Sequence, residues 1–164
     1  MASEGDPSEQ GESTPDTLHV RVEENVRVSD EFHAEVITYP QHLLNFSSKL
    51  INDGQFSIAA IVCHMACEIA TERTLSASFA KKGIEYLQES VLKLFSGYSL
   101  SNERLRRFYT ALTGDEIQKQ PFWREFDKLA TRRNDILHRG KIIGKDDANK
   151  SLEVAHTFVA HLKQ

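Results

Sequence analysis

The chain has 164 residues and a formal net charge of −4 at pH 7, so there is room for one folded domain and a short extra segment. Hydrophobic residues make up 40% and charged residues 27%, the balance of a soluble globular protein. No run of about 18 apolar residues occurs, which argues against a membrane span. The chain begins with acidic residues and without the basic and apolar blocks of a signal peptide. We therefore expect a cytoplasmic protein.

Charge is distributed unevenly along the chain. Residues 1–38 contain ten Asp or Glu against only Arg21 and Arg27, whereas residues 104–145 contain eleven Lys or Arg against five Asp or Glu. Such separation gives an acidic protein a local face for anions.

The first 39 residues divide into two expected segments. Residues 1–16 are rich in Ser, Gly, Glu, Asp and Pro, and they offer too little apolar surface to offset the entropy of ordering, so we expect a disordered acidic tail. Leu18, Val20 and Val22 then alternate with polar residues, which predicts an extended, β-like arm over 17–39. This arm is a candidate binding surface for a protein partner.

From residue 40 onward apolar residues recur at helical spacing and strand signals are absent. Prolines and glycines mark the ends of the periodic segments. The fold class we expect is all-α, a bundle of about five to six helices over residues 40–164. The expected helices cover residues 40–54, 56–83, 84–95, 101–114, 121–140 and 146–162.

The last two expected helices each have an apolar stripe. In the helix over 121–140 the stripe is broken by a polar run from Arg132 to Asp135, and the helix stops at Gly140. We expect the following residues of these helices in the core: Phe122, Phe126, Leu129, Ile136, Leu137, with Trp123 beside them, and Leu152, Ala155, Phe158, Val159 and Leu162.

The sequence offers no familiar cofactor motif. Gly-rich phosphate loops, HExxH and GxSxG are absent, and no cofactor is expected. Cys63 and Cys67 are four apart on an expected helix, too far for a disulfide, and no second pair with zinc spacing accompanies His64. We expect reduced core thiols and no metal site.

Glu68 is a carboxylate within an apolar run, between Cys67 and Ile69. Carboxylates are almost never fully buried without a partner. Either Glu68 reaches water at the edge of the core, or it pairs with a guanidinium of a neighbouring helix, Arg132 or Arg133.

The densest cluster of functional groups is "RRNDILHRG", residues 132–140. At about 100° per residue, Asn134 and His138 share a helix face, whereas Arg133 and His138 are about 140° apart. Two readings remain open. The residues form a solvated helix end capped by Gly140, or Arg133 and Asn134 hold a phosphate while His138 moves a proton. The phosphate-binding reading requires either that the long Arg133 side chain reaches round the helix to the face of His138, or that a second subunit supplies the facing half of the site.

These residues resemble the signature of the HEPN superfamily (higher eukaryote and prokaryote nucleotide-binding domains), an Arg followed by a polar residue and, three residues later, a His. Here Arg133, Asn134 and His138 match it, with Arg139-Gly140 closing the helix. The family is an all-α bundle with the motif on a late helix, and an acidic residue often lies in an earlier long helix, as Glu68 does. The resemblance covers roughly residues 40–164.

For active members the resemblance implies a metal-independent endoribonuclease that works as a homodimer, possessing two facing motifs. It assigns catalysis to Arg133, His138 and Asn134, with Glu68, Arg132 and Arg139 in support. RNA is then the substrate, and defence or stress response the setting. Other members are non-catalytic modules for dimerisation, nucleotide or RNA binding, or regulation of a partner. Both functions remain open on the sequence.

Overall fold

The computed structural model describes residues 38–163, all of which belong to one unit of the chain, Val36–Gln164. Between these bounds every regular element is helical and no strand occurs, which confirms the predicted all-α fold class. The acidic tail over 1–16 and nearly all of the arm over 17–39 lie outside the described residues. The elements are α1 (Tyr39–Asn52), α2 (Phe56–Lys81), the 3-10 helix η1 (Glu85–Leu87), α3 (Gln88–Leu92), α4 (Glu103–Thr113), the 3-10 helix η2 (Ile117–Lys119), α5 (Trp123–Arg139) and α6 (Lys145–Leu162).

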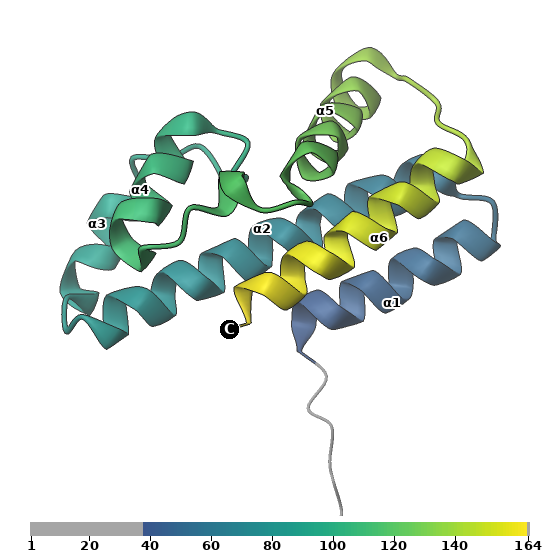
Figure 1. Cartoon of the computed structure of the whole chain (residues 1–164). Coiled ribbons are helices and arrows are strands. Elements are labelled where there is room, and N and C mark those ends of the chain that lie inside the picture. The colour runs from purple at the N-terminus through teal and green to yellow at the C-terminus, as the bar shows by residue number, and fades with distance from the viewer. Residues whose placement is uncertain (1–37, 164) are drawn as a thin grey trace, which may run out of the picture. The chain divides into compact units, whose positions relative to one another are not determined.

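Helices α1, α2 and α6 lie side by side, α5 crosses over them, and α3 and α4 lie toward the C-terminal end of α2 (Figure 1). α2 is the central element, with 26 residues and a length of about 39 Å at 1.5 Å per residue. Its buried face is built largely from small side chains, which let neighbouring helices approach closely. These residues are Ala59, Ala60, Cys63, Ala66, Cys67 and Ala70.

Large aromatic side chains fill the space between α2, α5 and α6. Phe126 and Phe158 are fully buried and stack with ring centroids 4.2 Å apart, and the ring of His64 of α2 stacks near Phe126 with a centroid distance of 6.3 Å. Burial of a Phe side chain contributes roughly 1.5–3 kcal/mol. These aromatic contacts therefore help to fix the position along α2 at which α5 packs.

The predicted helices are confirmed with two differences. The third is much shorter than expected: residues 84–95 form η1 and α3, and Tyr86, Leu87 and Leu94 are exposed. With these three side chains in water, the segment has less burial to stabilise one continuous helix. The second difference is Leu137, which we expected in the core but which is 48% exposed on the outer side of α5.

Candidate functional site

The two adjacent arginines of the motif lie on different sides of α5. Arg132 reaches α6, where its Nη2 lies 3.3 Å from Asp147 Oδ1, and its side chain is only 13% exposed. Arg133 points toward α2, because successive residues of a helix are rotated by about 100°. Glu68 shares a hollow with Arg133 but forms no ion pair within 4 Å with either arginine among the described residues, and its side chain is 24% exposed, so it reaches water at the edge of the core. Arg132 instead ties α5 to α6.

Arg133 lies at a hollow of about 340 Å³ between α5, α2 and the segment that joins α3 to α4. Its Nη1 donates to Asn134 Oδ1 at 3.1 Å, so the two motif residues are joined on the helix surface. The hollow is lined by Met65, Glu68, Ile69, Glu72, Ser96, Gly97, Tyr98 and Arg133. The structure thus brings the predicted residues Arg133, Asn134 and Glu68 into one region.

The carboxylate of Glu68 lies close to a buried histidine. His64, one turn earlier on α2 and 2% exposed, places Nδ1 3.5 Å from Glu68 Oε2. Partial burial raises the pKa of Glu68, but the hydrogen bond and charge of His64 and the charge of Arg133 together bring it below its usual value. Glu68 is therefore a carboxylate facing Arg133.

His64 is a site residue that sequence reasoning missed. Its Nε2 lies 3.0 Å from Ser99 Oγ, and Ser99 Oγ lies 2.9 Å from Ser101 Oγ. A chain of polar contacts therefore runs from Ser101 through Ser99 and His64 to Glu68. The spacing of His64 and Glu68, four apart on a helix, was visible in the sequence, but the two serines come from a distant loop.

His138 lies apart from this cluster. It is exposed in the last turn of α5, is absent from the lining of the Arg133 hollow, and has no hydrogen bond or ion pair within residues 38–163. The neighbouring Arg139 pairs with Asp135 at 3.1 Å, and Lys141 approaches the same carboxylate at 3.6 Å. In a single chain, Arg133 and His138 do not share one hollow.

Exposed apolar side chains border the motif. On α2, Ile58, Ile61, Met65 and Ile69 follow one helical face; Met65 is 41% exposed and lines the Arg133 hollow. On α5, Leu137 is one turn after Arg133 and therefore on the same side of the helix. Polar groups of the motif thus sit beside apolar surface on both helices.

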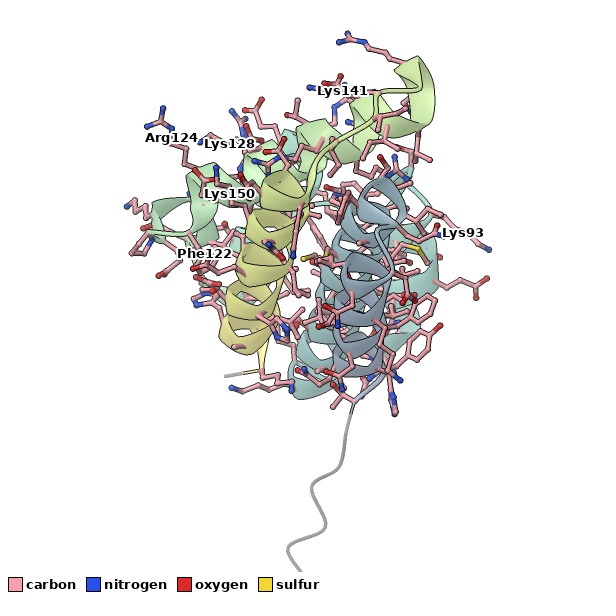
Figure 2. All side chains as sticks on the ribbon, turned by 90° about the vertical axis from the view of Figure 1, so that its right-hand side faces the viewer. Lys93, Phe122, Arg124, Lys128, Lys141 and Lys150 are labelled. Carbon is pink, nitrogen blue, oxygen red and sulfur yellow. The ribbon has the colours of Figure 1, made fainter. Side chains whose placement is uncertain are left out.

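A second hollow, of about 510 Å³, lies between α5 and α6. Figure 2 shows Lys128 of α5 and Lys150 of α6 on the same side of the molecule, with Arg124 beside them and Phe122 below. Lys128 pairs with Glu125, and Glu153 also lines this hollow. The cations there are largely balanced by acids, so the hollow is less suited to an anion than its lysines suggest.

The cysteine prediction is confirmed. Cys63 and Cys67 are buried and free, burial raises the pKa of Cys63 to about 11, and Ser47 Oγ lies 3.0 Å from Cys63 Sγ. Among the described residues, no three His, Cys, Asp or Glu side chains gather closely enough to hold a metal ion.

No helix in the described part of the chain has the length and apolar character needed to cross a membrane. Comparisons with protein-family models, with curated proteins and with solved structures found no match to this chain.

Proposed function

We propose that the chain is a metal-independent endoribonuclease of HEPN type that acts in the cytoplasm as a homodimer. The observation that carries the proposal is the arrangement of the motif. Arg133 shares a hollow with Glu68 and its charge lowers the pKa of that carboxyl, whereas His138 is exposed and without a partner among the described residues, next to exposed Leu137. Such an arrangement suits a site completed by a second copy.

In the proposed reaction the 2′-hydroxyl of a ribose attacks the adjacent phosphorus. The oxygen–phosphorus bond to the next nucleotide breaks, which leaves a 2′,3′-cyclic phosphate and a 5′-hydroxyl. His138 takes part in proton transfer, and the Arg133 guanidinium stabilises the charge that develops on the phosphate oxygens. Glu68 and Asn134 orient Arg133. The reaction consumes no water and involves no redox step.

The apolar border supports the homodimer. A specific interface buries about 800 Å² on each partner, with an apolar centre and a polar rim. The exposed residues of α2 and α5 supply such a centre beside the polar motif, and a two-fold axis through this surface would let each Arg133 meet the partner's motif.

The test is cleavage of total RNA by the full chain in excess EDTA. We expect His138→Ala and Arg133→Ala each to lower the cleavage rate by about 10²-fold or more, the usual range for a proton-transfer group, with the melting temperature little changed. Matched controls are His156→Ala, an exposed histidine of α6, and Arg107→Ala, an exposed arginine of α4 paired with Glu103. Both should cleave at the wild-type rate. Full activity in purified His138→Ala protein would refute the proposal.

A further inference from the structure

A third hollow, of about 720 Å³, lies away from the motif, where the C-terminal ends of α2 and α6 meet α4. Figure 1 shows the end of α6 lying beside α2 below α4. The volume is in the range of small-molecule sites. Its lining residues are Ala77, Ser78, Lys81, Lys82, Tyr109, Leu112, Thr113, Asp115, His161 and Leu162.

A hydrogen-bonded group of three side chains forms the polar wall of this hollow. Asp115 Oδ2 accepts from the buried Tyr109 hydroxyl at 2.7 Å and lies 2.8 Å from His161 Nε2. Because an ionised carboxylate only accepts, Nε2 of His161 must be the protonated nitrogen. Nδ1 of His161 has no partner among the described residues and is left for a ligand.

The position of Asp115 is fixed by its backbone as well as its side chain. Gly114 ends α4 in the left-handed region with φ of 81°, which turns the chain back toward the helix. The Asp115 amide donates to Thr113 Oγ1 at 3.1 Å, and its carbonyl accepts from Thr110 Oγ1 at 3.0 Å. Since four contacts hold Asp115, the His161 ring is held in one orientation, and Phe122 packs edge-on to it at 5.3 Å.

The charge balance of the hollow favours an anion. Lys81 and Lys82 are exposed, and neither has a carboxylate within 4 Å among residues 38–163. Asp115 is the one acid in the lining, and two donors already engage it. The hydroxyls of Ser78 and Thr113 donate to helix carbonyls, so the donors that remain for a ligand are the two lysines and, when protonated, His161 Nδ1.

We propose that this hollow binds a phosphate monoester, with the phosphate between Lys81, Lys82 and His161 and the organic group against Leu112 and Leu162. A phosphate monoester carries a charge of about −1.5 to −2 near pH 7, which two lysines match. Its second proton leaves near pH 6, so the phosphate either donates a proton to neutral Nδ1 or accepts one from the imidazolium. A carboxylate can only accept and supplies a single charge.

The experiment is a calorimetric titration of the full chain with phenyl phosphate, inorganic phosphate and benzoate at pH 6 and pH 8. We expect phenyl phosphate to bind more tightly than either other anion, because inorganic phosphate lacks the apolar group and benzoate lacks the second charge. Its affinity should fall at pH 8, where the shared proton is lost.

Besides His161, the titratable groups that line the hollow are Lys81, Lys82, Tyr109 and Asp115. Burial and the hydrogen bond to Asp115 raise the pKa of Tyr109, so this phenol stays neutral at both pH values.

Substitutions distinguish phosphate binding in this hollow from non-specific electrostatic binding of anions elsewhere on the surface. The double substitution Lys81→Ala with Lys82→Ala should weaken phenyl phosphate binding at least about tenfold, since it removes two charge-assisted contacts. His161→Gln should weaken binding at pH 6, and its affinity for phenyl phosphate should no longer fall between pH 6 and pH 8. Lys93→Ala is the control, an exposed lysine on another part of the surface, paired with Glu89 (Figure 2). The same affinity in the double-lysine variant as in wild type, or benzoate binding as tight as phenyl phosphate, would overturn the proposal. RNA cleavage is not a readout of this site, so the two proposals fail separately.

Discussion

At the scale of single residues, neighbouring side chains of the motif have different structural environments. Arg132 and Arg133 look equivalent in the sequence, but one pairs with Asp147 of α6 and the other faces Glu68 of α2. The sequence left open whether Glu68 reaches water or pairs with one of these two guanidinium groups, and it did not decide between them. The choice depends on how α5 is rotated over α2, which is set by burial of Phe126 and not by the arginines themselves.

A pH-dependent contribution to stability follows from Glu68. Its pKa lies below the usual 4.5, so the ionised carboxylate stabilises the folded state, and this stabilisation is complete above pH 4.5 and is lost as pH falls through the lowered pKa. Glu68→Gln should therefore be less stable than wild type at pH 7, by less than about 1.5 kcal/mol because the contact with His64 is long. Urea unfolding curves at pH 7 and at pH 3 measure the difference, which should shrink at pH 3.

Glu85→Gln is the matched control for this measurement. Glu85 is exposed in η1 and has no cation within 4 Å among the described residues, so its substitution should change stability little at either pH. If the deficit of Glu68→Gln were as large at pH 3 as at pH 7, the carboxylate charge would not be its cause.

At the scale of elements, most helix boundaries were predictable because local chemistry sets them. Pro40 lies in the first turn of α1, Asn102 caps α4 by accepting from the amides of Arg104 and Leu105, and Gly140 closes α5. The segment over 84–95 was mispredicted: Leu92 is buried, but Tyr86, Leu87 and Leu94, which share its apolar pattern, are exposed. Helical spacing by itself cannot reveal whether a partner helix is present.

Gly140 offers a test of how α5 ends. Its φ is 64°, in the left-handed region, and the amides of Gly140 and Lys141 donate to the carbonyls of Ile136 and Asp135 at 3.2 Å. Gly140→Ala should lower the free energy of unfolding by about 1–2 kcal/mol, the cost of this conformation for a residue with Cβ. Gly140→Asn should cost less, because Asn tolerates the left-handed region better. Urea unfolding checks both, and equal losses in the two variants would exclude backbone conformation as the reason.

At the scale of the whole molecule, the polar constellations at both ends of the bundle depend on contacts between residues far apart in the chain. His161 and Asp115 are 46 residues apart, and His64 and Ser99 are 35 apart. His161 lies on the last helix, and its partner Asp115 comes from the loop after α4. No spacing rule within one element links such pairs, which is why neither was predicted.

The proposed homodimer predicts that one surface substitution shifts the protein from dimer toward monomer. Leu137→Lys puts a charge into the expected interface and should raise the dimer dissociation constant at least about tenfold, with little effect on the melting temperature because Leu137 is 48% exposed. Sedimentation velocity over a range of protein concentrations measures this. Tyr86→Lys is the control: Tyr86 is 78% exposed in η1, beyond the C-terminal end of α2, and its substitution should leave the dimer intact. A monomeric wild-type chain at high concentration would contradict the proposed homodimer.

The opposed directions of Arg132 and Arg133 have a mechanical consequence for α5. Arg132 pairs with Asp147 of α6, and the charge of Arg133 acts on Glu68 of α2, so a twist of the helix about its own axis would weaken one of these two interactions. Arg132 and Arg133 together therefore limit torsion of α5. They thereby also limit the direction in which the exposed imidazole of His138, in the last turn of α5, extends toward solvent.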